Sequence, residues 1–210
     1  MNEIIRLDNV SIDSSGRNLL NTSLRINKGD FVLIYGDNAV GKSLLLKLLY
    51  LKILPSRGNI YLFKKKISSE SKEKIIEYRK KLGVILQSDF LIPFFTVFQN
   101  IEIASEIQNK KYEFKKRMTE ILDWLDLAKI RNVLVGKLSD GQKQKVVIAR
   151  ALINNPSIII ADQPENYLDD ETTKKLFFLL ESLNKLGATI VMTSNKNHNI
   201  KNDHRVVKLI

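Results

Sequence analysis

An eight-residue segment, GDNAVGKS, carries the residues with the clearest chemistry in this chain. It follows the apolar run FVLIY, precedes a Leu-rich segment typical of a helix, and matches the G-x-x-x-x-G-K-[ST] spacing of a phosphate-binding loop. Glycines let the backbone wrap so that successive N–H groups face an anion, and the positive end of the next helix adds to the attraction. We therefore predict a nucleotide site that consists of Gly36, Asp37, Asn38, Ala39, Val40, Gly41, Lys42, Ser43 and Leu44. An ordinary glycine-rich turn is the alternative.

Two side chains of this loop have separate expected roles. The Lys42 ammonium should reach the β- and γ-phosphates, and the Ser43 hydroxyl should bind Mg²⁺. Such a site also needs an acidic group for the metal, normally at the end of a neighbouring apolar strand. The segment SIIIAD supplies Asp162 at that place, so Ser43 and Asp162 are predicted to hold the metal.

Strand-like and helix-like segments that could position these groups alternate along the chain. Apolar runs rich in β-branched residues at 31–35, 157–161 and 188–193 predict buried parallel strands. The segments EIIRLDNV and SLRIN alternate like an antiparallel edge, and helical spacing recurs at residues 43–53, 111–128 and 170–186. The pattern predicts an α/β fold with a parallel sheet covered on both faces.

Length and composition limit the possibilities further. The chain has 210 residues, no cysteine and two histidines, which leaves little for a zinc or disulfide site. We expect a single domain over residues 1–210, with a core of about 1–87 and 155–210 and a helical subdomain inserted at about 88–154. No run of about 18 apolar residues occurs, so we expect no direct membrane insertion. The start, MNEIIRLDNV, has no cationic segment leading into an apolar stretch, so we expect no signal peptide.

A formal net charge of +11 is typical of proteins that bind a polyanion such as nucleic acid. The basic residues are scattered along the chain and Lys far outnumbers Arg, which is more typical of a solvated surface and of compositional drift than of a binding face. We therefore expect no dedicated nucleic-acid binding. A phosphate-loop protein that binds nucleic acid is kept as an alternative hypothesis.

Between the phosphate loop and Asp162 lies LSDGQKQKVVIARAL, residues 138–152. With this segment the chain resembles the ATP-binding subunits of ABC transporters, whose signature LSGGQ precedes a basic helix. The resemblance implies a P-loop NTPase (RecA-like) core with an antiparallel β edge and an inserted α-helical subdomain. It also implies ATP and Mg²⁺ as ligands, Gln87 as the glutamine-loop metal contact and Asp169 as the D-loop aspartate.

The same resemblance implies a head-to-tail homodimer around two ATP molecules. Each nucleotide would contact the partner subunit's signature residues, which are Ser139, Asp140, Gly141 and Gln142. A Ser hydroxyl and a glycine N–H at a helix start can cradle a γ-phosphate, which makes dimer closure depend on nucleotide. A plain helix cap is the alternative role for this motif.

Four positions depart from the family pattern. Gln163 replaces the glutamate that polarises the attacking water, Asn195 replaces the switch histidine, and VSIDSSGRN lacks the aromatic residue that stacks on adenine. Asp140 replaces the first signature glycine, and its carboxylate would repel the γ-phosphate unless it points away or pairs with a neighbouring Lys. We predict that Lys42, Gln163 and Asn195 are the catalytic residues. Because Gln163 and Asn195 replace the usual Glu and His, we expect ATP hydrolysis to be slow.

Within the superfamily the chain is most similar to the FtsE family of cell-division ATP-binding proteins, with the LolD type of lipoprotein-release ATPases next. The stretches that carry this similarity are YRKKLGVILQSDFLIPFFTVFQNI, VVIARALINNPSIIIAD and ENYLDDE. It implies an integral membrane partner of the FtsX type and a peripheral location at the cytoplasmic face of the inner (plasma) membrane. A nucleotide-sensing pseudo-ATPase scaffold is the alternative to a slow ATPase.

The surface for the membrane partner can be placed by the same resemblance. In the family, a helix of the partner enters the groove beside the glutamine loop, which here corresponds to residues 90–98. That segment carries Phe90, Phe94, Phe95 and Phe98, more apolar surface than one solvent-facing loop should expose. The equally weighted alternative is that these rings fill the core of the helical subdomain.

Overall fold

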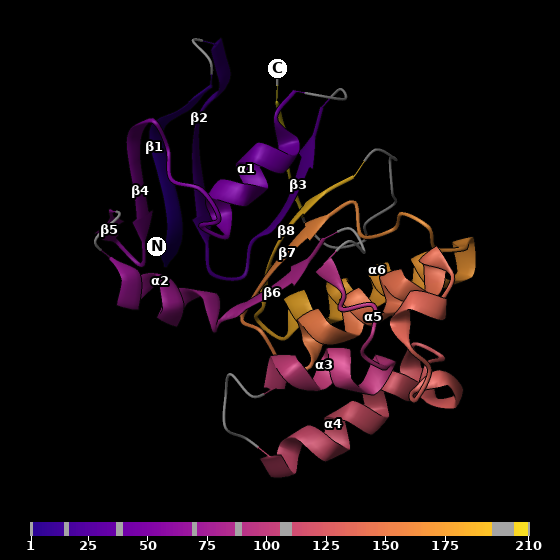
Figure 1. Cartoon of the computed structure of the whole chain (residues 1–210). Coiled ribbons are helices and arrows are strands. Elements are labelled where there is room, and N and C mark those ends of the chain that lie inside the picture. Colours follow the sequence, from indigo (N-terminus) through magenta and orange to yellow (C-terminus); the bar gives the residue numbers. More distant parts are fainter. Residues whose placement is uncertain are drawn as a thin grey trace.

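Parallel and antiparallel strands form two separate sheets in the computed structural model, which describes residues 2–14, 17–36, 40–68, 71–86, 90–105, 111–194 and 204–209 (Figure 1). Over these residues the parallel sheet has the order β6-β7-β8-β3-β9. Its strands are β3 (Phe31–Tyr35), β6 (Leu82–Ile85), β7 (Ile158–Asp162), β8 (Thr189–Thr193) and β9 (Arg205–Lys208). The antiparallel sheet has the order β2-β1-β4-β5, with β1 (Glu3–Ser14), β2 (Arg17–Asn27), β4 (Arg57–Leu62) and β5 (Lys65–Ile67).

Helices cover both faces of the parallel sheet (Figure 1). They are α1 (Lys42–Leu49), α2 (Lys72–Arg79), α3 (Val97–Ser105), α4 (Lys111–Trp124), α5 (Asp140–Leu152) and α6 (Asp170–Lys185), with 3₁₀ turns η2 (Ala128–Ile130) and η3 (Val135–Lys137). The described residues between 90 and 154 form helices and turns, and their one β-bridge joins Thr96 to Leu134. The boundaries of a separate helical subdomain stay a prediction. None of the described helices is long and apolar enough to cross a membrane.

Alternate side chains of the central strands enter two different hydrophobic clusters. Phe31 and Leu33 of β3 pack with α5 and α6, whereas Val32 and Ile34 pack with α1 and the antiparallel sheet. Both faces of this strand are therefore buried, which explains why its sequence is a continuous apolar run and not an alternating one. The predicted strands at 31–35, 157–161 and 188–193 are confirmed to within one residue at each end.

Two predicted helices end earlier than the sequence pattern indicates. Helix α1 stops at Leu49 and not at residue 53, because Leu51 adopts a left-handed φ of 56°. The N–H of Lys52 then donates to the Lys47 carbonyl and the N–H of Leu51 to the Leu48 carbonyl, which is a Schellman ending. Helix α4 ends at Trp124 in the same way, with a φ of 57° at Asp126, so residue 128 belongs to a 3₁₀ turn.

A close approach of β4 to β1 gives a test of this fold. Gly58 has a φ of +83°, and a Cβ there would lie 2.2 Å from the Asn9 carbonyl oxygen. Gly29 has the same φ of +83° but no atom within 4 Å of a built Cβ, so it is a matched control. We expect Gly29→Ala to lower the free energy of unfolding by about 1 kcal/mol and Gly58→Ala by about 3 kcal/mol.

Urea denaturation followed by circular dichroism measures both losses. Equal losses for the two variants would contradict the contact between Gly58 and the β1 backbone.

Candidate functional site

The predicted phosphate loop connects β3 to the start of α1. Lys42 begins the helix, is 6% exposed and donates from Nζ to the Gly36 carbonyl oxygen at 2.5 Å, so its side chain folds back over the loop. Val40 and Leu44 are half-buried and Ser43 is exposed, while Asp37, Asn38 and Ala39 lie outside the described residues. The structure thus brings Gly36 and Lys42 together across the loop.

Both glycines of the loop occupy positions where a side chain would be crowded or strained. Gly41 has a φ of +95°, and a Cβ there would lie 3.3 Å from the Leu19 carbonyl oxygen. A Cβ on Gly36 would lie 2.9 Å from the Leu209 carbonyl oxygen. Gly41 is also the N-cap of α1 and has no side chain to cap it, and the positive end of the helix dipole lies at this point of the loop.

Asp162 lies at the same edge of the sheet as the phosphate loop. It is the last residue of β7 and pairs in register with Thr193, the last residue of β8, which in turn pairs with Ile34 near the end of β3. The carboxyl ends of parallel strands meet at one edge, where α/β proteins bind their ligands. Burial raises the pKa of the Tyr50 hydroxyl and the Asp162 carboxylate raises it further, whereas Arg79 lowers it.

The backbone turns sharply after Asp162. Gln163 has a left-handed φ of 45°, and its N–H donates to the Thr193 carbonyl oxygen at 3.2 Å and to the Thr193 hydroxyl at 3.0 Å. Its side-chain Oε1 accepts from Asn166 Nδ2 at 2.9 Å. The amide that replaces the expected glutamate is therefore already engaged by a neighbour in its own loop.

A second contact joins this loop to the end of β8. The Ser194 hydroxyl donates to Glu165 Oε1 at 2.6 Å, and both residues are buried. The sequence analysis did not identify Thr193, Ser194 or Glu165, although two consecutive hydroxyl residues at the carboxyl end of an apolar strand are a usable signal. Asn195, the predicted switch position, lies outside the described residues.

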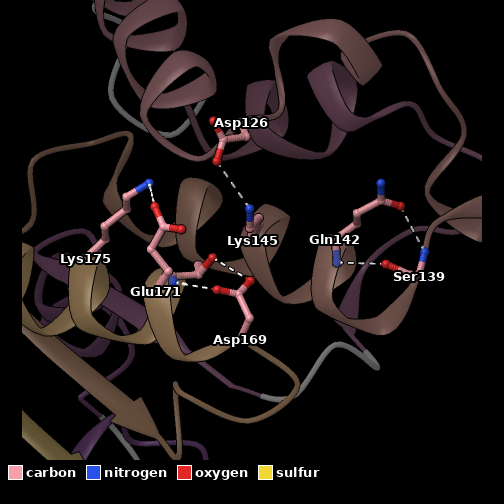
Figure 2. Close-up of polar contacts among 8 residues, drawn as sticks. Asp126, Ser139, Gln142, Lys145, Asp169, Glu171 and Lys175 are labelled. Carbon is pink, nitrogen blue, oxygen red and sulfur yellow. Dashed lines mark hydrogen bonds and ion pairs between the residues drawn. The ribbon is translucent and has the colours of Figure 1, made fainter.

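The signature motif forms the start of α5 (Figure 2). Ser139 is its N-cap: the hydroxyl accepts from the Gln142 N–H at 3.3 Å and Gln142 Oε1 accepts from the Ser139 N–H at 3.1 Å, which is a capping box. The Ser139 hydroxyl retains its own proton for donation. Asp140 pairs with Lys143 at 3.1 Å, which is one of the two arrangements in which its carboxylate would not repel a γ-phosphate.

The start of α5 packs on the loop that follows β7. A Cβ on Gly141 would lie 2.8 Å from the Tyr167 carbonyl oxygen, and buried Gln144 donates from Nε2 to the Pro164 carbonyl oxygen at 3.1 Å. The structure therefore places signature residues and the segment after Asp162 side by side within one chain.

Charged side chains of α5 and α6 lie around the predicted D-loop aspartate, Asp169 (Figure 2). Lys145 of α5 pairs with Asp126 at 3.5 Å. Asp169 caps α6, and donation from the Thr172 N–H and hydroxyl lowers the pKa of its carboxyl, as does the nearby Lys145 charge. Lys175 pairs with Glu171 at 2.8 Å, and this contact raises the Lys175 pKa.

The Phe-rich segment divides between core and surface. Leu91 and Val97 are buried, whereas Phe90 is 51% and Phe94 is 72% exposed. Arg150 of α5 donates to the Phe90 carbonyl oxygen at 2.8 Å, and burial lowers the Arg150 pKa. Gln87, the predicted glutamine-loop residue, lies outside the described residues. Phe98 is half-buried against the core, so the rings of this segment fill the core only in part.

Comparisons with known proteins agree with this architecture. A family profile described as ABC transporter matches residues 19–166. The cell division ATP-binding protein FtsE of Bacillus subtilis is 36% identical over 83% of this chain and 77% of its own length. The methionine import ATP-binding protein MetN of Francisella tularensis is 40% identical over 84% of this chain, which spans only 51% of MetN.

A solved structure gives the same result in three dimensions. An ATP-binding cassette in a dimeric post-hydrolysis state bound to ADP and Pi matches with a TM-score of 0.88 at 32% identity, over 98% of this chain and 94% of the other. The fold class predicted from the sequence is confirmed. Cassettes of this kind bind ATP with Mg²⁺, hydrolyse ATP and work as dimers with a membrane transporter partner. The chain belongs to the ABC transporter family, as an ATP-binding subunit.

Proposed function

We propose that this chain is a slow ABC-type ATPase that dimerises around ATP and couples binding and hydrolysis to an FtsX-type membrane protein in cell division. The observation that carries the proposal is the sheet edge that two groups share. The phosphate loop, in which Lys42 donates to the Gly36 carbonyl oxygen, follows β3, and Asp162 ends β7, with only β8 between these two strands. The subunit would act at the cytoplasmic face of the inner membrane as a peripheral protein, in a homodimer.

The residues present fit ATP with Mg²⁺. The positive end of α1 follows Gly41, Lys42 supplies a cation there, and a Cβ on Gly36 would lie 2.9 Å from the Leu209 carbonyl oxygen. Bound Mg²⁺ would neutralise charge on the β- and γ-phosphate oxygens. Ser43, Gln87 and Asp162 would hold the metal, residues 36–44 the phosphates, and residues 139–142 the nucleotide of the second subunit.

Slow turnover follows from the chemistry of Gln163. An amide cannot take a proton from water at neutral pH, so general-base assistance on the order of 10²- to 10⁴-fold is lost. The Gln163 side-chain Oε1 already accepts from Asn166 Nδ2, which also reduces the freedom of this amide to orient a water. The same contact favours a second candidate function, a nucleotide-sensing scaffold that dimerises on ATP with little turnover.

Steady-state phosphate release separates these two functions. We expect slow release from the natural chain that Lys42→Ala abolishes, because the variant loses the cation that faces the phosphates. Gln163→Glu combined with Asn195→His should raise turnover about tenfold or more, because the carboxylate can accept the proton from water.

The control is nucleotide binding, which the double variant should retain. Release from the natural chain that Lys42→Ala leaves unchanged would contradict the ATPase assignment. No gain in the double variant would show that another step limits the site.

The membrane partner is proposed from sequence similarity and from one exposed ring. The 36% identity to FtsE covers most of the chain, and Phe94, next to Phe95, is the most exposed aromatic side chain of residues 90–98. We propose that this surface receives a helix of the partner.

Capture of a co-expressed FtsX-type protein from detergent extracts tests the contact. Phe94→Ser should reduce capture by about tenfold, because a buried aromatic anchor contributes on the order of 2 kcal/mol to an interface. Phe178→Ser is a matched control, because Phe178 is 70% exposed on α6. Equal capture by both folded variants would contradict docking at Phe94.

A further inference from the structure

We propose that Thr193 is a positioning residue that fixes the Asp162 carboxylate for Mg²⁺. The inference deepens the proposed function, because it rests on Asp162 as a metal-binding group. Thr193 is fully buried at the carboxyl end of β8, directly beside Asp162 at the end of β7. Its hydroxyl lies 2.7 Å from Asp162 Oδ1 and 3.0 Å from the Gln163 nitrogen.

The direction of these two hydrogen bonds is set by chemistry. A backbone N–H can only donate, so the Thr193 oxygen must accept from Gln163. An ionised carboxylate can only accept, so the single hydroxyl proton goes to Asp162 Oδ1. The hydroxyl therefore acts as a bridge with one fixed orientation.

This bridge makes the two carboxylate oxygens of Asp162 unequal. Oδ1 accepts a charge-assisted hydrogen bond from Thr193, which is about twice as strong as a neutral one. Among the described residues no donor contacts Oδ2. The torsion that orients a carboxylate is otherwise broad, so the bond from Thr193 restricts it and leaves Oδ2 as the oxygen that the metal would use.

The loop after β7 has other attachments that do not need the Thr193 hydroxyl. The Gln163 N–H also donates to the Thr193 carbonyl oxygen at 3.2 Å, and Ser194 holds Glu165 at 2.6 Å. Replacement of Thr193 by Val keeps the shape of the side chain and these contacts. Its specific effect is then the loss of the proton donor to Asp162.

The same strand offers a matched control. Thr189, at the other end of β8, is also fully buried, and its hydroxyl accepts from the Gly29 N–H at 2.9 Å. Thr189→Val therefore removes a buried hydroxyl from β8 without touching the carboxylate. A general destabilisation of the strand would affect both variants, whereas loss of metal positioning would affect only Thr193→Val.

Titration of the full chain with fluorescent mant-ATP, with Mg²⁺ or with excess EDTA, tests the inference. Thr193→Val should raise the Mg²⁺ concentration at half-saturation by about tenfold, the effect of one lost hydrogen bond to a charged group. Its affinity for mant-ATP in EDTA should match that of the natural chain. Thr193→Ser should restore the Mg²⁺ dependence, and Thr189→Val should leave it unchanged.

Several results would overturn the inference. They are an unchanged Mg²⁺ dependence in folded Thr193→Val, an equal shift in Thr189→Val, or no rescue by Thr193→Ser. Thr193→Ala serves as a second variant if Thr193→Val does not fold, with the same expected shift. Absence of mant-ATP binding to the natural chain would instead remove the proposed function, so the two failures are distinguishable.

Discussion

The parallel pairing of β7, β8 and β3 is the constraint on which the candidate site depends. This pairing puts Asp162, Thr193 and Ile34 at one level across three strands. The phosphate loop, the Asp162 carboxylate and the Thr193 hydroxyl therefore lie at the same edge of the sheet. Helices on both faces keep these strands buried, and burial makes the short hydrogen bonds at the edge stronger than they would be in water.

The central strands could be predicted from the sequence because their burial on both faces makes them continuous apolar runs. The strands β4, β5 and β6 and the polar helix α2 carry no such run, and the sequence analysis did not identify them. Helix ends show the same contrast. Helix α6 ends before Gly187, a residue that readily adopts the left-handed conformation, and its end was predicted to within one residue. The equivalent positions after α1 and α4 are Leu51 and Asp126, which carry a weaker signal or none.

The candidate site shows the same contrast between features with a local sequence signal and contacts that depend on the fold. The phosphate loop is local, so its spacing alone singles out Lys42 and its glycines, and pairing with a neighbouring Lys was one of two alternatives for Asp140. The contacts Thr193–Asp162, Ser194–Glu165 and Asn166–Gln163 were not predicted. The first two join segments about 30 residues apart in sequence, and only the strand register brings them together. The last is local, but it depends on the left-handed turn at Gln163, which a glutamine does not signal.

The tight seating of Gly141 against the Tyr167 carbonyl oxygen has a mechanical consequence. With no space between them for even a methyl group, the start of α5 cannot approach residues 163–168 without pushing them. Gln144, bonded to Pro164, opposes separation in the other direction. The start of α5 and the segment between Asp162 and Asp169 are therefore held at a fixed spacing, by one close backbone approach and one buried side-chain hydrogen bond.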